Sequence, residues 1–525
     1  MNADASVSCK ELLSLNQERV LLFQEIARRQ GMRRVANVLY ICLKIDGEID
    51  TVALEEAVSS ISGRHSAFRT VIMRNSAISD ARWESAFAAF SRTGIVPRGL
   101  FVQRSTASVE TAIHRHDHRG IERESQLDAI RPIVEREAAR FLGEEIPHRI
   151  GMNLIQEDDS RHLLILAIDH RISDGWSAKL IAHEIEQLYR RFVDGLAPPA
   201  APGMGYPEFT AWQNEALQTS YFDEDLAYWE QHWREFGGAR ISHVDLPFAH
   251  GGPIPAVSGN FKTERLVIDN VDLVRIRAKA RQLRVTLYMW SQAALASVLR
   301  HYTKKEKLAL WCHCQNRILP QTWSTVGYFI NTHINGLVVP ENVTFQDLLT
   351  QVRSRQTATL KHQQMPLPHL WRTLQCGPRF TDSGIMLDYG QLDRGNQIQH
   401  VRDEKEVTFR PITLEQTLPR MANIGINITD RGHELLLRAD YLSTLYASEG
   451  VKEMLKDFVE MATAASTKVD LNISTLKTVT RRYAHHPPSH GTEMSEFVLL
   501  DSQGLPRREA SPEASGSAVC VDQTS

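Results

Sequence analysis

The stretch Leu163-Leu-Ile-Leu-Ala-Ile-Asp-His-Arg-Ile-Ser-Asp-Gly-Trp-Ser177 decides how this chain folds. Residues 163–168 are all apolar, which is typical of a buried strand, and the run is far too short to cross a bilayer. A short polar turn follows, and apolar residues then recur at helical spacing over residues 176–192. The stretch therefore predicts a strand, a turn and a helix, with polar side chains where the strand ends.

Helices and strands alternate on both sides of this stretch. Before it, the patterns predict a helix over residues 11–29, a strand over 35–45, a helix over 51–62 capped by Asp50, and a strand over 67–73. Residues 74–120 have a weak pattern, which predicts loops with short helices. After it, we expect a helix over 287–302 capped by Thr286, strands over 308–314, 326–334 and 385–389, a hairpin within 424–441, and a helix over 447–464.

Two breaks rich in proline, glycine or alanine, residues 196–203 and 247–259, interrupt the order of elements. The parts before and after them have similar helix and strand content, so the fold class we predict is α+β. We place a first domain over residues 1–195 and a second over 196–475. Residues 476–525 are rich in serine, proline and glycine, and we predict that they form a disordered tail.

Composition excludes several classes of protein. The 525 residues carry 60 basic and 63 acidic side chains, a net charge of −3, which gives no reason to expect nucleic acid or a membrane as partner. The six cysteines are sparse and form no CxxC pair, so neither a disulfide scaffold nor a zinc site is expected. We interpret the dense histidines of residues 114–118 as a solvated loop without a metal. Residues 1–10 lack an apolar signal segment, and we expect a cytoplasmic protein.

The polar residues after the predicted strand are the candidates for chemistry. Side chains alternate along a strand, so Asp169 and His170 are expected to point to opposite faces. Asp174 and Gly175 stand where the helix begins, and free N–H groups there stabilise developing negative charge. A histidine base with backbone donors nearby suits acyl transfer. The alternative is structural: a hydrogen-bonded histidine at a strand end, with Asp174 as a helix cap.

Six segments, in order, resemble the motifs of condensation domains from nonribosomal peptide synthetases. Asp169-His-Arg-Ile-Ser-Asp-Gly175 is similar to the family's His-His-x-x-x-Asp-Gly motif. The other five are Ser14-Leu-Asn-Gln-Glu-Arg19, Arg64-His-Ser-Ala-Phe-Arg-Thr70, Tyr206-Pro-Glu-Phe-Thr-Ala-Trp212, Val326-Gly-Tyr-Phe-Ile-Asn-Thr332 and His362-Gln-Gln-Met-Pro366. The resemblance covers about residues 10–475.

The resemblance implies a fold and a reaction. The fold is two chloramphenicol-acetyltransferase-like lobes arranged as a V-shaped pseudo-dimer, with the active site between them. The reaction joins an acyl thioester, carried on the phosphopantetheine of a carrier protein, to an amine or hydroxyl acceptor. No intrinsic cofactor is implied. The sequence holds no Walker-type loop and no Gly-Gly-x-Ser carrier motif, so we expect a free-standing enzyme whose thioesters arrive on separate proteins.

The resemblance also implies roles for single residues. The catalytic motif residues map onto His170, Asp174 and Gly175: His170 as base or positioning group, Asp174 as a structural member paired with an arginine, and Gly175 as a backbone donor near the thioester carbonyl. Arg317 is the candidate partner of Asp174. Asn331, Thr332 and Trp176 are candidates to line the substrate cleft, with packing as the alternative for Asn331 and Thr332.

Asp169 departs from the family pattern, because the motif has a histidine there. This departure leaves two other functions open. One is a catalytically degenerate domain that recruits other proteins, as some family members do. The other is an acyltransferase that uses acyl-CoA as donor.

Overall fold

The computed structural model describes residues 10–29, 38–107, 112–122, 125–141, 150–236, 244–250, 261–375, 377, 384–391, 407–412, 414–416, 423–475 and 497–499. Most of the predicted break at 247–259 lies outside these ranges. So does the predicted disordered tail, except for strand β15 (Phe497–Leu499), which pairs with β12 (Leu414–Gln416); disorder of the tail stays a prediction. No helix among the described residues is long and apolar enough to cross a membrane.

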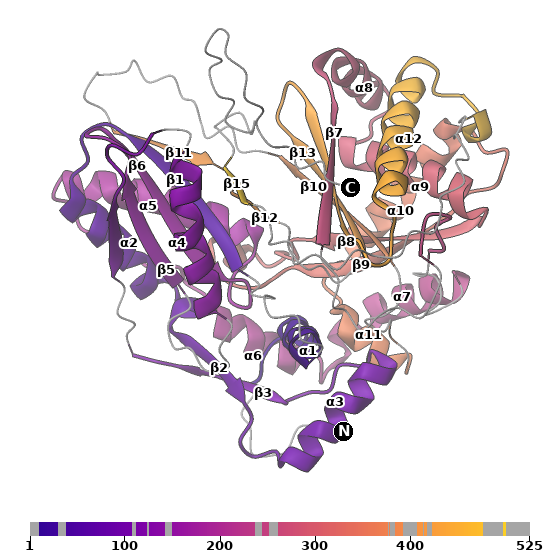
Figure 1. The fold of residues 1–525 in the computed structure, drawn as a ribbon. Helices are drawn as coiled ribbons and strands as arrows, with labels where there is room; N and C mark the ends of the chain where they lie inside the picture. Colours follow the sequence, from indigo (N-terminus) through magenta and orange to yellow (C-terminus); the bar gives the residue numbers. More distant parts are fainter. Residues whose placement is uncertain are drawn as a thin grey trace, which may run out of the picture.

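The first lobe is built on a five-stranded sheet, drawn in indigo and purple in Figure 1 except for its edge strand from residues 408–412, which is orange. Across the sheet the strands are β11 (Thr408–Ile412), β1 (Val38–Asp46), β6 (Arg161–Asp169), β5 (Ile150–Gln156) and β4 (Ile113–Asp117). Helices α2 (Thr51–Arg64) and α5 (Gly175–Val193) pack on one face and α4 (Gln126–Arg140) on the other. Strand β6 is therefore buried on both faces, which explains its unbroken apolar run.

The second lobe is built on a six-stranded mixed sheet. Across it the strands are β7 (Phe261–Ile268), β14 (Leu435–Leu442), β13 (Ile424–Asp430), β10 (Ile385–Gln391), β8 (Lys307–Cys314) and β9 (Asn331–Val338). The helices that cover its outer face are α8 (Asn270–Gln282), α9 (Leu287–Thr303), α10 (Phe345–Lys361) and α12 (Ser448–Thr467). The opposite face of this sheet is turned toward the first lobe, as Figure 1 shows.

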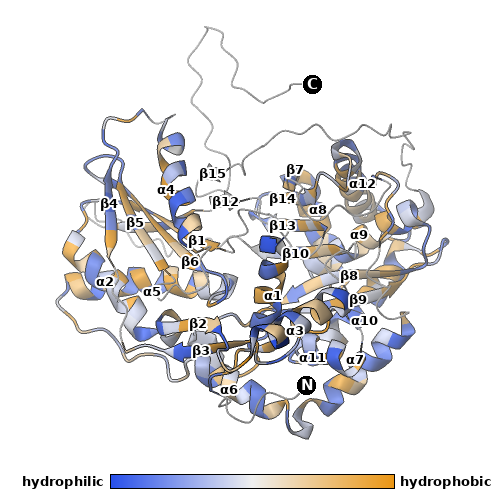
Figure 2. Ribbon diagram, turned by 60° about the horizontal axis from the view of Figure 1, so that its bottom comes forward, coloured by the Kyte–Doolittle hydropathy of each residue, from blue (hydrophilic) through white to orange (hydrophobic). Residues whose placement is uncertain are grey.

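A layer of smaller elements joins the lobes at the bottom of Figure 1. It contains α1 (Leu15–Arg29), α3 (Asp80–Thr93), α6 (Tyr206–Ala216), α7 (Asp223–Glu235), α11 (Leu367–Thr373), and the paired strands β2 (Thr70–Arg74) and β3 (Phe101–Ser105). Trp229 of α7 and Trp371 of α11 pack there against Trp311 of β8 in a small separate core. Figure 2 shows hydrophobic residues concentrated on the strands, with hydrophilic ones on the outer helix faces.

Several segments from the second half of the sequence are part of the first lobe. Strand β11 comes from the second half of the sequence but pairs with β1 of the first lobe. Tyr206 and Phe209 of α6, together with Tyr328 and Phe329, are buried in the core of the first lobe. The predicted division at residue 195 does not account for these segments, and the domain bounds stay a prediction.

Several local predictions agree with the structure. Asp50 caps α2 by accepting the N–H groups of Val52 and Ala53, and Thr286 caps α9 by accepting that of Met289. The predicted hairpin is the antiparallel pair β13 and β14. These elements were predictable because a cap or a turn depends on neighbours in sequence.

Other local predictions are wrong in type or bounds. The predicted strand over 326–334 begins only at Asn331, because residues 326–330 cross toward the first lobe without joining a sheet. The predicted strand over 67–73 begins at Thr70, after a short 3₁₀ turn over Ser66–Arg69. The expected loops of 74–120 include the long helix α3, which buries Trp83, Phe87 and Phe90. The histidines of residues 114–118 lie on and just after the edge strand β4, not on a loop.

Candidate active site

His170 directly follows β6 and is held by the turn that comes after it. Its Nδ1 lies 2.6 Å from the carbonyl oxygen of Ser173. Because a carbonyl only accepts, Nδ1 donates, and the neutral ring keeps Nε2 as a hydrogen-bond acceptor. Burial lowers the pKa of His170, although the charge of Asp174 acts in the opposite direction. The partly exposed ring is therefore neutral near pH 7 and presents a basic nitrogen.

Asp169 points away from this ring, into the protein. Both of its oxygens accept from the Arg171 side chain, with Nη2 at 2.6 Å and Nε at 2.9 Å, and the Arg171 backbone N–H donates to it at 2.8 Å. The carbonyl of Arg171 accepts from Gln17 Nε2 of α1 at 2.8 Å. This buried ion pair stands where the family motif has a histidine, and it braces the turn that carries His170.

Asp174 joins the start of α5 to two segments of the second half of the chain. Its Oδ1 accepts from the Ser177 N–H at 2.8 Å and from Arg317 Nη2 at 3.0 Å, and its Oδ2 accepts from the Phe329 N–H at 3.1 Å. The Asp174 and Arg317 side chains are each only 3% exposed. The structure thus brings the predicted partners Asp174 and Arg317 together. Burial lowers the pKa of Arg317, and the Asp174 charge opposes that shift.

Gly175 is the first residue of α5 and is exposed. A Cβ placed there would meet nothing within 4 Å, so the space beside the backbone is open. The first N–H groups of a helix have no partner within the helix. The geometry therefore offers a backbone donor beside an open space, close in sequence to the His170 ring.

Tyr328, in the segment that precedes β9, contacts the His170 ring. The Tyr328 ring packs edge-on against the His170 ring, with centroids 5.4 Å apart. A Cβ on Gly327 would lie 1.9 Å from the Tyr206 ring, so this position requires glycine. The Tyr206 hydroxyl donates to the Tyr328 carbonyl at 2.6 Å. No local pattern indicates a role for Tyr328, although it lies within a motif segment, because its contact with His170 depends on the tertiary fold.

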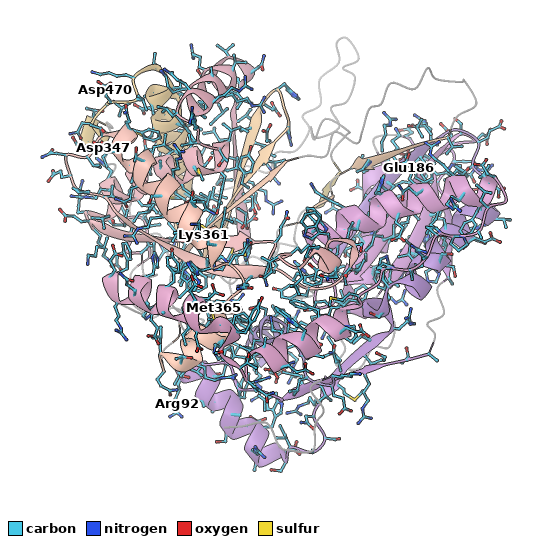
Figure 3. All side chains as sticks on the ribbon, turned by 180° about the vertical axis from the view of Figure 1, so that it is seen from behind. Arg92, Glu186, Asp347, Lys361, Met365 and Asp470 are labelled. Atoms are coloured by element: carbon cyan, nitrogen blue, oxygen red, sulfur yellow. The ribbon has the colours of Figure 1, made fainter. Side chains whose placement is uncertain are left out.

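The three predicted lining residues differ in their surroundings. Asn331 is fully buried, and its Nδ2 donates to the carbonyls of Gln363 and Met365, the latter labelled in Figure 3. Thr332 is 1% exposed and accepts from Arg19 Nη2 at 3.0 Å. These contacts support the packing alternative for both residues. Trp176 is partly exposed, and its Nε1 donates to the Trp323 carbonyl at 2.9 Å, so it alone of the three has substantial free surface.

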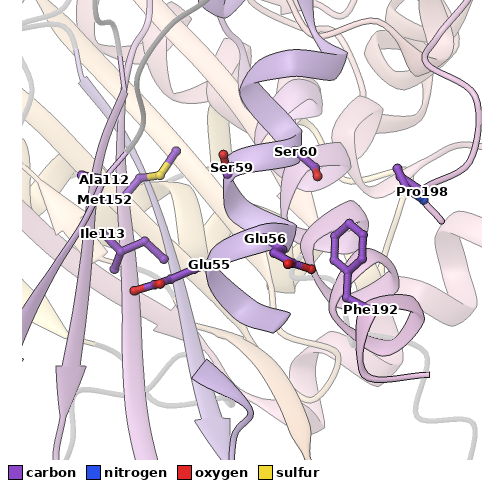
Figure 4. Close-up of a pocket in the computed structure, with 9 residues that line it drawn as sticks. All are labelled: Glu55, Glu56, Ser59, Ser60, Ala112, Ile113, Met152, Phe192 and Pro198. Carbon is purple, nitrogen blue, oxygen red and sulfur yellow. The ribbon is translucent and has the colours of Figure 1, made fainter. Parts of the chain in front are cut away.

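Two surface pockets, each with a volume of about 650 Å³, lie away from these residues. One, shown in Figure 4, lies between α2 and strands β4 and β5 of the first lobe and is lined by side chains that include Glu55, Ser59 and Met152. The other lies between α7 and α10 and includes Arg353 and Lys361. Neither contains a predicted site residue. Among the described residues, no group of three or more His, Cys, Asp or Glu side chains is arranged to hold a metal ion.

Comparison with known proteins identifies the family. The sequence model described as the condensation domain matches residues 92–485. The chain belongs to the condensation-domain family. Members of this family are acyltransferases that form amide bonds in nonribosomal peptide synthesis.

Relatives of this condensation domain are much longer proteins. Tyrocidine synthase 3 of Brevibacillus parabrevis is 26% identical over 477 residues, which cover 89% of this chain and 6% of that protein. Malpinin synthetase of Mortierella alpina is 28% identical over 339 residues, which cover 64% of this chain and 4% of that protein. The chain therefore spans only a small part of the length of these curated relatives.

Solved structures share the fold at low sequence identity. The X-domain from teicoplanin biosynthesis has a TM-score of 0.70 and 16% identity, covering 91% of this chain and 99% of that one. The first condensation domain of the calcium-dependent antibiotic synthetase, in complex with a substrate analogue, has a TM-score of 0.65 and 16% identity, covering 91% of this chain and 100% of that one. The predicted α+β class and chloramphenicol-acetyltransferase-like fold are confirmed.

Proposed function

We propose that this condensation domain joins an acyl thioester borne by a carrier protein to an amine acceptor, with His170 as its base. One observation carries the proposal: the hydrogen bond from His170 Nδ1 to the Ser173 carbonyl leaves Nε2 as an acceptor on a neutral ring. Gly175, beside open space at the start of α5, supplies the backbone donor. The phosphopantetheine arm belongs to the carrier and is part of the substrate.

The proposed reaction needs no covalent intermediate on the protein. The amine donates an N–H hydrogen bond to His170 Nε2, which orients its lone pair toward the thioester carbonyl. The C–N bond forms, negative charge develops on the carbonyl oxygen, and the helix N-terminus favours that charge. The C–S bond then breaks, and the proton lost by the amine passes through His170 to the leaving thiolate. An amide and a free carrier thiol result.

The partners and setting belong to the same proposal. We assign the domain to nonribosomal peptide or related secondary-metabolite biosynthesis, such as that of an antibiotic, in the cytoplasm. Its partners are carrier proteins loaded with acyl or peptidyl thioesters and an amine acceptor, with a hydroxyl acceptor giving an ester as the variant product. Family membership and the similarity to tyrocidine synthase 3 support this assignment.

The test compares His170→Ala with His183→Ala on carrier proteins loaded with a panel of acyl groups. His183 lies on the exposed face of α5 and serves as the matched control. We expect His170→Ala to lower single-turnover amide formation by about 100-fold or more, the range of general-base catalysis, and His183→Ala to leave it unchanged. Full activity in His170→Ala contradicts the proposal. Acyl-CoA donors run in parallel decide between carrier-bound and CoA-bound thioesters.

Recruitment of another protein is the second candidate function, and Asp169 favours it because it departs from the family motif. The X-domain from teicoplanin biosynthesis, which shares this fold, has been solved in a complex with OxyB. If the domain recruits and does not catalyse, purified tailoring enzymes bind the wild type and His170→Ala equally, and no carrier-bound donor is consumed.

A further inference from the structure

The second lobe carries another imidazole–carboxylate pair on the sheet face turned toward the first lobe. His313 Nδ1 of β8 lies 3.0 Å from Asp388 Oδ1 of β10, and each side chain is 23% exposed. A carboxylate accepts from Nδ1–H and holds the ring in one orientation, with Nε2 as the remaining acceptor. This pair is distinct from the motif that contains His170.

The register of the sheet fixes the direction in which the pair points. Leu310 and Cys312 of β8 and Leu387 of β10 belong to the core under the outer helices. Because side chains alternate along a strand, His313 and Asp388 point away from that core, to the face that Figure 1 shows turned toward the first lobe. The pair therefore lies on the inner side of the second lobe.

A short series of contacts connects His313 to His170. Thr332 of β9 stands directly opposite His313 in the β8–β9 register. Thr332 accepts from Arg19, which is also hydrogen-bonded to Tyr328, and the Tyr328 ring packs on the His170 ring. The charge of His313 also contributes to lowering the pKa of His170. His313 of the second lobe is thus linked to His170 of the first through Thr332, Arg19 and Tyr328.

His333, on the neighbouring strand β9, differs from His313 in its surroundings. His333 is 3% exposed, its Nε2 contacts Cys314 Sγ at 2.9 Å, and burial lowers its pKa to about 3. Among the described residues, Asp388 on β10 pairs with His313, and the charge of His313 acts on His333 of β9 and on His170 of the first lobe. Asp388 is the carboxylate that contacts His313 Nδ1 directly.

We propose that His313 is a further catalytic residue, which takes the first proton from an amine acceptor that arrives as an ammonium ion. The inference rests on the proposed function. The ammonium gives one proton to His313 Nε2 and becomes a neutral amine, and the imidazolium formed is stabilised by Asp388. The amine nitrogen then attacks the thioester carbon, its C–N bond forms, and its second proton leaves through His170 to the departing sulfur. His313 returns its proton to water.

The experiment uses the full chain, one carrier-bound acyl donor and two small amines at pH 7. Propylamine is an ammonium ion at this pH, whereas methoxyamine is neutral and needs no first deprotonation. We expect His313→Gln to lower amide formation from propylamine by about 10-fold or more and from methoxyamine by less than about 3-fold. Raising the pH to 9.5 is expected to restore part of the propylamine rate. His170→Ala is expected to lower both rates at pH 7.

The control is His362→Gln, because His362 forms an equivalent pair with Asp225, at 2.7 Å, near the surface pocket between α7 and α10. It is expected to change neither rate. Asp388→Asn keeps the shape of the site and is expected to repeat the effect of His313→Gln, which keeps the test valid if one variant folds poorly. Equal losses with both amines overturn the inference alone. A wild type that is inactive with every donor overturns the proposed function and the inference together.

Discussion

Asp169 makes this motif unusual, and its surroundings explain why a carboxylate is stable there. The Asp169 and Arg171 side chains are 2% and 8% exposed and bond to each other through both oxygens. The Arg171 carbonyl also bonds to Gln17. A charge in such a site is stable only with its partner, so the two residues act as a unit. The unit keeps the His170 turn in place without contributing to the face that presents the ring.

We predict that Asp169→Ala destabilises the domain by about 3–5 kcal/mol, because it leaves the buried Arg171 without a counter-charge. The double variant Asp169→Ala with Arg171→Leu is expected to recover most of this loss. The exposed pair of Asp158 and Arg161 is the control, and Asp158→Ala is expected to cost about 1 kcal/mol or less. Unfolding in urea gives the free energy of unfolding of the single variant, the double variant and the control. A double variant as unstable as the single one contradicts the prediction.

At the scale of elements, α1 is the helix that connects the lobes. Its Arg19 and Asn16 bond to β9 of the second lobe, and its Gln17 bonds to the His170 turn of the first. Glu18, on the same helix, accepts the Gly99 N–H at 2.5 Å and is 2% exposed. Burial raises the pKa of Glu18 to about 7, although the charges of Arg98 and Arg372 oppose the shift.

This raised pKa predicts a dependence of stability on pH. The folded state keeps Glu18 protonated between about pH 4.5 and 7, whereas the unfolded state releases the proton, so stability falls as the pH rises through this window. Glu18→Gln keeps the acceptor and removes the charge. We expect it to be neutral near pH 4.5 and to stabilise the domain by about 1–3 kcal/mol at pH 8.

Glu25→Gln on the same helix is the control for Glu18→Gln. Burial by itself would raise the pKa of Glu25 too. Hydrogen bonds from Arg28 and Arg29 outweigh burial, so the pKa of Glu25 is lowered. Replacing Glu25 is therefore expected to give no gain in stability at pH 8. Urea unfolding at several pH values measures both variants, and an equal effect of Glu18→Gln at pH 4.5 and 8 contradicts the prediction.

Local patterns predicted the elements that depend on near neighbours. The apolar run of β6, the cap Asp174 and the periodicity of α5 all lie within thirty residues. The pairing of Asp174 with Arg317 was predictable only through resemblance to the family. His313 and Asp388 meet because β8 and β10 are neighbours in one sheet, and the order of strands is not encoded in any local pattern. The prediction of a strand over residues 326–330 was wrong for the same reason: their apolar side chains pack on the first lobe, and no local pattern indicates this.

For the whole molecule, the segments that the second half of the chain contributes to the first lobe decide whether that lobe can fold alone. Side chains from beyond residue 195 lie in the core of the first lobe: Tyr206, Phe209, Val326, Tyr328, Phe329 and Phe409. Burying each large apolar side chain contributes about 1.5–3 kcal/mol. Their sum is comparable to the whole stability of a typical domain, about 5–15 kcal/mol.

We therefore predict that residues 1–195, expressed alone, do not form a cooperatively folded domain. Without β11 the edge of β1 is also unpaired, which favours association. Near-UV circular dichroism, binding of the dye ANS and thermal unfolding are the measurements, with the full chain as reference. Co-expression with residues 196–475 is expected to restore the native signals, because it supplies the missing side chains and the strand. A sharp thermal transition and native near-UV signal from residues 1–195 alone contradict the prediction, and they would mean that the β6 core suffices without the segments that cross between the lobes.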